Sequence, residues 1–149
     1  MSQSEFVYVT YIKTSPEKLW KALTTTEFTW QYWFGTHMVS DWKEGSVISL
    51  EQADGTKNVV GKILSYQPFT ELAYTFQSVD VPNEKPSRVH FKLDKDGDLV
   101  ELTVRHDQLD PAGETIKRIS GGWPAVLSSL KSLLELGQAL NYDASPCGH

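Results

Sequence analysis

A period-two alternation of apolar and polar residues is clear in three stretches between residues 72 and 106. The residues on the shared apolar face are Leu72, Tyr74 and Phe76, then Val89, Phe91 and Leu93, then Val100, Leu102, Val104 and His106. A period of two is typical of strands that bury one face and expose the other to water. The pattern therefore predicts an antiparallel sheet whose apolar face must be covered by a second layer.

Turn-forming residues and runs of β-branched or aromatic residues outline the rest of the sheet. Asp54-Gly55 and Asp96-Gly97 are strong signals for β-hairpins, and residues 80–86 form a predicted loop. We expect a curved sheet of six to seven strands. The predicted strands are Phe6–Ile12, Thr36–Asp41, Val47–Gln52, Asn58–Tyr66, Leu72–Gln77, Ser87–Leu93 and Leu99–His106.

Two short helices are predicted between the first and second strands. Ser15 can cap the first helix, and Pro16 suits its first position. Residues 24–27, with the sequence Thr-Thr-Thr-Glu, have the form of a capping box for the second helix. Gly35 should end that helix.

The last predicted element is a long helix. Its apolar residues follow steps of three and four, and they are Ile116, Ile119, Trp123, Val126, Leu127, Leu130, Leu133 and Leu134. Only this helix is long enough to cover the sheet, and the two short helices can close the open end. We therefore expect an α+β fold in which residues 1–142 form one domain and residues 143–149 form a flexible tail.

Composition and charge narrow the classes of partner and location. A chain of 149 residues fits one domain, and a net charge of −5 disfavours nucleic acid as a partner. No apolar run approaches the roughly 20 residues that a membrane-spanning helix needs, so we expect no membrane insertion. The N-terminus does not resemble a secretory signal, and Cys147 is the sole cysteine. We therefore expect a cytoplasmic protein.

The order of these elements resembles the family of homologues of the activator of a heat-shock-chaperone ATPase. This family belongs to the START-related superfamily, also called SRPBCC. The resemblance runs from about Phe6 to Leu140, and its carriers are Ser15 to Leu23, Trp33-Phe34, Gly61 to Ile63, Leu72 to Phe76, Gly122-Trp123, Leu127 and Leu130. It implies a helix-grip fold with a cavity between the last helix and the sheet.

Related domains bind lipids, sterols, polyketides or plant hormones in that cavity, and some are cyclases. The co-chaperone that gives the family its name carries an additional domain for much of its contact with the chaperone. A chain of 149 residues is too short to hold both domains. The resemblance therefore implies ligand binding more directly than chaperone activation or a part in the stress response.

Pro124 departs from the family pattern. Proline cannot donate the helical hydrogen bond to the Ser120 carbonyl, and its ring crowds that group. The last helix should therefore either begin at Trp123 or kink at Gly121-Gly122. We expect this segment to gate ligand entry, with faster amide exchange at residues 119–122 than at residues 127–134.

The strongest candidate site is a cluster of aromatic side chains. Aromatic walls with a few polar groups are typical of small-molecule pockets. The competing interpretation is a filled core without a cavity. The predicted ligand-binding residues are Trp30, Trp33, Phe34, Tyr74, Phe76, His106, Trp123, Leu127 and Leu130.

His106 lies on the inward register of its strand. It could bind a ligand carbonyl or exchange a proton, but we favour a structural histidine that a neighbouring hydroxyl or carbonyl satisfies. No histidine or cysteine spacing matches a metal site, and no phosphate loop or nucleophile elbow is present. We therefore expect no metal, no cofactor and no assigned catalytic residue.

Three hypotheses remain open. The first is a binder of a small hydrophobic or aromatic molecule, such as a lipid-like compound, a polyketide or a polyphenol. The second is an interaction module that contacts a chaperone or another protein through its outer sheet face or residues 80–86. The third is a cyclase or hydrolase that uses His106 and Tyr74 as acid–base groups.

Overall fold

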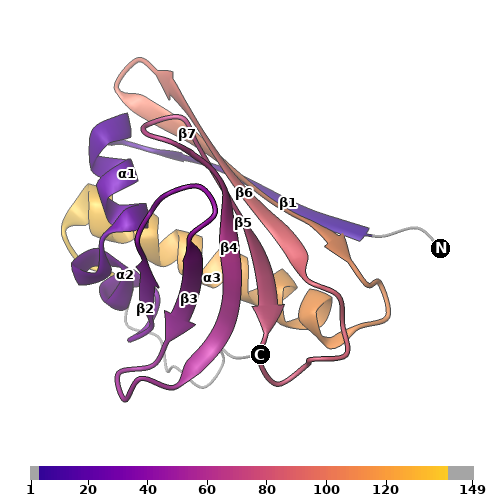
Figure 1. The fold of residues 1–149 in the computed structure, drawn as a ribbon. Coiled ribbons are helices and arrows are strands. Elements are labelled where there is room, and N and C mark those ends of the chain that lie inside the picture. The colour runs from indigo at the N-terminus through magenta and orange to yellow at the C-terminus, as the bar shows by residue number, and fades with distance from the viewer. Residues whose placement is uncertain (1–3, 141–149) are drawn as a thin grey trace.

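A computed structural model describes residues 4–140 of the chain, so the predicted tail at residues 143–149 lies outside the described residues. Seven antiparallel strands form one curved sheet in the order β1-β7-β6-β5-β4-β3-β2 (Figure 1). The strands are β1 (Ser4–Ile12), β2 (His37–Ser40), β3 (Val47–Glu51), β4 (Lys57–Gln67), β5 (Glu71–Ser78), β6 (Ser87–Asp96) and β7 (Leu99–Leu109). The predicted α+β architecture, with a curved sheet around a long terminal helix, is confirmed.

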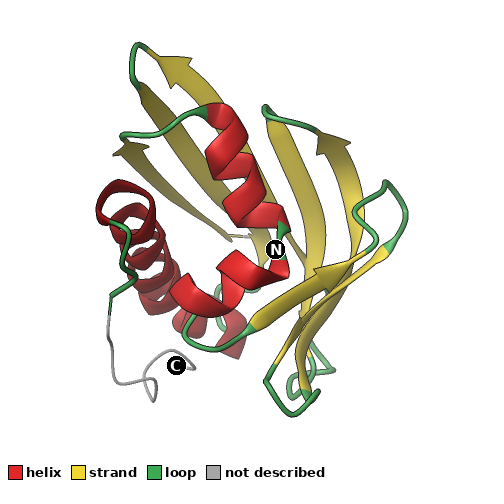
Figure 2. Ribbon diagram, turned by 90° about the vertical axis from the view of Figure 1, so that its left-hand side faces the viewer, coloured by secondary structure: helices red, strands yellow, loops and turns green. Residues whose placement is uncertain are grey.

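Three helices lie on the concave side of the sheet (Figure 2). They are α1 (Pro16–Thr24), α2 (Thr26–Tyr32) and α3 (Glu114–Leu136). The apolar stripe of α3 faces the sheet, because Leu127 and Leu130 are almost completely buried together with Tyr74 and Phe76 on β5. One continuous core thus connects the terminal helix with the concave face, as the two hydrophobic periods predict.

The N-terminal ends of the short helices differ from one another. Ser15 caps α1 as predicted, because its hydroxyl oxygen accepts a hydrogen bond from the Lys18 amide at 3.2 Å. The predicted capping box of α2 is wrong, since the N-cap of α2 is Thr25 and its side chain makes no capping bond. Thr24 is still the last residue of α1, and its hydroxyl donates to the Trp20 carbonyl at 2.8 Å.

Several strands differ in length from the predicted ones. β7 continues to Leu109, three residues beyond His106, because main-chain pairing persists after the apolar alternation has ended. β2 is shorter than predicted and covers only His37–Ser40. Register shifts in the β1–β7, β3–β4 and β4–β5 pairs interrupt the ladders. Such bulges increase local twist and bend, which helps the sheet to curve around α3.

α3 is one helix from Glu114 to Leu136, with Pro124 inside it. The expectation that the helix begins at Trp123 is therefore wrong. Packing explains the difference, since residues on both sides of Pro124 are buried against the sheet, including Ile119, Trp123 and Leu127. Tertiary contacts on both flanks can hold a helix through a position where proline removes one hydrogen bond.

Candidate functional site

A cavity of about 670 Å³ lies between the first half of α3, the end of α2 and strands β3, β4 and β5. One side of α3 faces the cavity, because the residues of this helix that line it are spaced three or four apart, as on one face of a helix. These lining residues are Thr115, Arg118, Ile119, Gly122, Trp123 and Val126. The same helix that covers the core thus also forms one wall of the cavity.

Four aromatic side chains line this cavity: Trp33, Phe34, Phe76 and Trp123. The rings of Trp33 and Trp123 meet edge to face, with centroids 5.5 Å apart. Behind them, Phe91 contacts Trp123 in the same manner at 5.7 Å. Edge-to-face packing holds aromatic rings in defined orientations. The cavity therefore has an aromatic wall that rests directly on the buried core.

His106 stands behind this wall in a hydrogen-bonded chain. The Trp123 indole N–H donates to His106 Nδ1 at 3.0 Å, and His106 Nε2 lies 2.7 Å from the Ser87 hydroxyl. Because the indole nitrogen is only a donor, Nδ1 must carry a lone pair and the neutral ring must hold its proton on Nε2. That proton goes to the Ser87 oxygen, and the Ser87 hydroxyl donates to the Phe76 carbonyl at 3.2 Å.

Burial lowers the pKa of His106 to about 3, so the ring is neutral in the folded protein at ordinary pH. Both of its nitrogens are occupied, and His106 does not line the cavity. The hydroxyl of Ser87 is the kind of partner that the structural interpretation of His106 requires. This arrangement leaves His106 no free nitrogen with which to exchange a proton with a ligand.

The pKa of His106 predicts a loss of stability in mild acid. The unfolded chain binds a proton at this residue below about pH 6.5, whereas the folded chain binds it only near pH 3. Stability from this group is therefore complete above pH 6.5 and falls as the pH drops. We expect His106 to lower the free energy of unfolding by about 2 kcal/mol between pH 7 and pH 5.

Urea unfolding of the wild type and of a His106→Gln variant at both pH values measures this term. The difference between the two pH values should shrink by about 2 kcal/mol in His106→Gln. The matched control is His90→Gln, because His90 lies on the outer face of β6 with its side chain 29% exposed. If the free energy of unfolding of His106→Gln depends on pH as it does in the wild type, His106 is not the cause of the loss of stability in acid.

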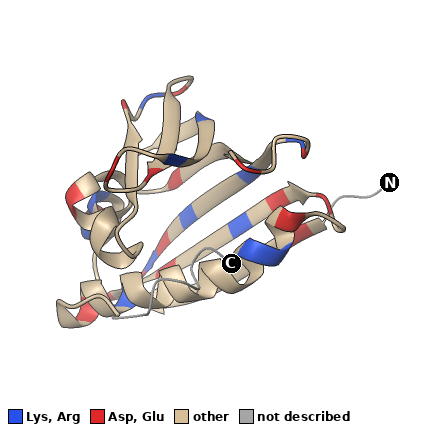
Figure 3. Ribbon diagram, turned by 90° about the horizontal axis from the view of Figure 1, so that it is seen from below, with Lys and Arg blue, Asp and Glu red and all other residues tan. Residues whose placement is uncertain are grey.

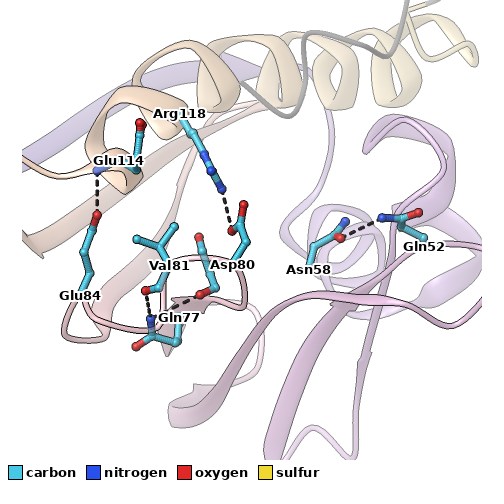
Figure 4. Close-up of polar contacts among 9 residues, drawn as sticks. Gln52, Asn58, Gln77, Asp80, Val81, Glu84, Glu114 and Arg118 are labelled. Carbon is cyan, nitrogen blue, oxygen red and sulfur yellow. Dashed lines mark hydrogen bonds and ion pairs between the residues drawn. The ribbon is translucent and has the colours of Figure 1, made fainter.

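Polar side chains surround the outer part of the cavity (Figure 4). Arg118 Nη1 on α3 donates to Asp80 Oδ1 at 2.8 Å, and this bond lowers the pKa of Asp80 and raises that of Arg118. On the opposite side, the Gln52 amide donates to Asn58 Oδ1 at 2.9 Å. Donors and acceptors of both kinds thus line the outer part of a cavity whose inner wall is aromatic.

The predicted site residues fall into three groups. Trp33, Phe34, Phe76 and Trp123 line the cavity. Tyr74, His106, Leu127 and Leu130 are buried but are not part of the lining. Trp30 is also outside the lining, and it is 49% exposed because it lies on the outward side of α2.

Sequence reasoning missed the polar residues of the cavity. Gln52 and Asn58 flank the predicted Asp54-Gly55 turn, and Asp80 begins the predicted loop at residues 80–86. Their positions at strand ends next to loops were a usable signal, because binding residues concentrate on loops held by a rigid scaffold. Nothing in the sequence paired Asp80 with Arg118, which lies 38 residues further along the chain.

Two buried tyrosines behave differently. The Tyr32 hydroxyl donates to the Ala22 carbonyl at 3.0 Å, whereas the Tyr74 hydroxyl has no hydrogen-bond partner within residues 4–140. Burial raises the pKa of both phenols. Tyr74 therefore stays protonated, and it has no adjacent base in the described part of the chain. The geometry does not support the acid–base pair of His106 and Tyr74.

Within the described range, no group of three or more histidine, cysteine, aspartate or glutamate side chains is arranged to hold a metal ion. Among the described helices, none is long and apolar enough to cross a membrane. Charged residues occur along the strands and towards the two ends of α3 (Figure 3). The stretch of α3 from residue 119 to residue 130 carries no charge, which suits a helix that packs on a core and a cavity.

A sequence profile described as "Activator of Hsp90 ATPase homolog 1-like protein" matches residues 13–135. A search of curated protein sequences finds no match. The sequence match covers most of the chain, from the end of β1 to the last turn of α3.

Solved structures of several proteins are similar to this chain. The Aha1 dimer from Colwellia psychrerythraea superposes with a TM-score of 0.77 at 20% identity, covering 91% of this chain and 99% of that one. CalU16 from Micromonospora echinospora gives 0.72 at 19% identity, covering 87% and 73%. An HSP90 activator from Plasmodium falciparum gives 0.69 at 18% identity, covering 80% and 86%. At these identities the similarity establishes the fold alone.

Proposed function

The chain belongs to the Activator of Hsp90 ATPase homolog 1-like protein family, and from that premise we propose that it binds a small hydrophobic or aromatic molecule in the cavity between α3 and the sheet. The observation that carries this proposal is the cavity of about 670 Å³ with an aromatic inner wall. Small-molecule sites usually measure about 300–1,000 Å³ and combine apolar walls with a few polar groups. A filled core would leave no such volume.

The distribution of side chains suggests how the ligand lies. The apolar body of the ligand packs against Trp33, Phe76 and Trp123 on the inner wall. A polar group at its other end stays among Gln52, Asn58 and the Asp80–Arg118 pair. This orientation leaves no buried charge without a partner, which would otherwise oppose binding.

A chemical-shift titration with N-phenyl-1-naphthylamine and with a flavonol tests the proposal. Amide signals of Trp33, Phe76, His106 and Trp123 should shift together, because the first, second and fourth line the cavity and His106 bonds to Trp123. The indole signal of the half-exposed Trp30 is the internal control and should stay in place. Shifts confined to the outer sheet face would count against the proposal.

A pair of glycine variants makes the test sharper. A Cβ at Gly121 or at Gly122 would meet no atom within 4 Å, but only Gly122 lines the cavity. Gly122→Leu should therefore occupy the cavity and weaken probe binding at least about tenfold, while Gly121→Leu should leave affinity within about threefold. Both variants remove one helical glycine, so any general stiffening of α3 is matched between them. Equal affinities would argue that the probe binds elsewhere.

A second candidate is a protein-interaction module of the co-chaperone kind. Val7, Val9 and Tyr11 on the outer face of β1 are 48%, 47% and 45% exposed, and exposed apolar side chains in a row favour a protein contact. Adding a purified chaperone of the Hsp90 class to the labelled chain separates the two candidates. Broadening confined to β1 would favour the second candidate, and unchanged spectra would exclude it.

A further inference from the structure

We propose that residues 114–120, the first two turns of α3, form a gate to the cavity. The gate opens by bending at Gly121-Gly122, and hydrogen bonds to residues 79–86 hold it closed. Residues 114–120 are called the entry helix, and residues 79–86, which join β5 to β6, are called the latch loop. This inference rests on the proposed ligand binding and adds how the same site is opened. Three features carry it: the attachment of the latch loop, the glycine pair, and the anchoring of α3 beyond that pair.

The latch loop supplies the N-terminal cap that the entry helix lacks. The N-cap position of α3 is Gly113, which has no side chain to accept a hydrogen bond. Glu84 takes this role from the loop, because its Oε2 accepts the Glu114 amide N–H at 2.7 Å (Figure 4). A Cβ on Gly113 would lie 2.7 Å from the Glu84 carboxyl group. With glycine at position 113, the cap of α3 therefore comes from another segment, and a larger residue there would displace the Glu84 carboxyl group.

A second bond joins the same two segments one turn further along α3. Arg118 of the entry helix donates to Asp80 of the latch loop at 2.8 Å, and both residues line the cavity. The loop itself is tied down, since the Gln77 amide donates to the Val81 carbonyl at 2.9 Å and Val81 is buried. The loop is thus the fixed side of the latch and the helix is the side that can move.

The glycine pair marks where movement is easiest. Neither Gly121 nor Gly122 has an atom within 4 Å of a Cβ built on it, so close packing does not explain the absence of side chains. Glycine adds backbone freedom, and Pro124 removes the main-chain hydrogen bond to Ser120. Two successive weaknesses therefore lie between the entry helix and the rest of α3.

Beyond the glycine pair, α3 is firmly anchored. Trp123 is buried and bonded to His106, and Leu127 and Leu130 are almost completely buried. The entry helix buries less, with Thr115 and Ile119 as its buried residues. Closure is therefore the resting state, and opening requires the loss of the packing of Thr115 and Ile119 and of the two latch bonds.

Stopped-flow fluorescence of the full chain with N-phenyl-1-naphthylamine tests the latch. Glu84→Gln weakens the capping bond from outside the cavity lining, so association and dissociation rates should both rise about tenfold, the effect of losing one helix cap. The dissociation constant should stay within about threefold, because a gate changes the association rate and the dissociation rate by the same factor. Asp94→Asn, in the exposed β6–β7 hairpin, is the matched control and should leave both rates unchanged. Unaltered rates in Glu84→Gln would overturn the proposal.

Hydrogen exchange tests the hinge without any ligand. A swing at Gly121-Gly122 breaks the hydrogen bonds that span it, so the amides of Gly122, Trp123 and Ala125 should exchange faster than those of residues 127–134. Their exchange should accelerate in Asp80→Asn and slow down in Gly121→Ala. Equal protection along α3 would overturn the hinge. If the probe fails to bind the wild type, the proposed function fails. Hydrogen exchange along α3 still decides whether the gate opens at Gly121-Gly122.

Discussion

Replacing Trp123 with alanine is expected to lower the free energy of unfolding by about 3–5 kcal/mol. Trp123 is 3% exposed, and its ring contacts Trp33, Phe91 and His106. Truncation removes these contacts and leaves a void next to the existing cavity. It also removes the donor to His106 Nδ1, and an unpaired buried acceptor is itself unfavourable. The variant should additionally lose probe binding, because it removes part of the aromatic wall.

Urea unfolding followed by circular dichroism measures this effect. Trp30→Ala is the matched control, since Trp30 is 49% exposed and lies outside the cavity lining. Its effect should stay below about 1 kcal/mol, as is usual for exposed positions. Equal losses of the free energy of unfolding in the two variants would mean that Trp123 does not anchor α3 to the core. A Trp123→Ala protein that still binds the probe with wild-type affinity would place the ligand away from this wall.

Gly61→Ala is expected to destabilise the fold by about 3 kcal/mol or more, the range of severe overpacking. Gly61 lies in β4 beside β5, near the register shift between Ile63 and Ser65. A Cβ at this position would sit 1.9 Å from the main-chain carbonyl oxygen of Thr75. A backbone atom cannot rotate away as a side chain can, so the two strands must separate. The substitution therefore disrupts the pairing of β4 with β5, in the part of the sheet that forms the cavity.

Gly121→Ala is the matched control, because a Cβ there meets nothing within 4 Å. Alanine also favours helix over glycine by about 1 kcal/mol, so this variant should be as stable as the wild type or more stable. Thermal and urea unfolding of both variants give the comparison. A Gly61→Ala protein with wild-type stability would show that β4 and β5 do not approach as closely as the structure has them.

The sequence contains enough information for the fold because the signals are local and repeated. Alternation between residues 72 and 106 specifies strands with one apolar face, and the three-four spacing of α3 specifies a helix of matching apolarity. Only one arrangement buries both surfaces in a chain of this size. The expected capping box at residues 24–27 failed because Thr24 belongs to the preceding helix, where its hydroxyl bonds to Trp20. When one short helix follows directly on another, the last residue of the first helix can also match the capping pattern of the second.

The candidate site was predictable only in part. Aromatic residues on apolar stripes were recognisable, and Trp33, Phe76 and Trp123 do line the cavity. The same signal did not separate cavity walls from filled core, so Tyr74, Leu127 and Leu130 were grouped with them although they lie outside the lining. Apolar periodicity reports which face is buried, but it carries no information on whether the space beyond is filled.

By itself, the sequence determined the order of the elements, the buried face of each strand and the apolar stripe of the last helix, because these follow from contacts between near neighbours in the chain. Tertiary structure alone decided the contacts between distant segments. It made Glu84 the cap of a helix that begins at Glu114 and paired Asp80 with Arg118. It also placed Trp123 and Ser87 on the two nitrogens of His106. Such contacts depend on how the sheet bends and where α3 crosses it, and no periodicity in the chain encodes those two quantities.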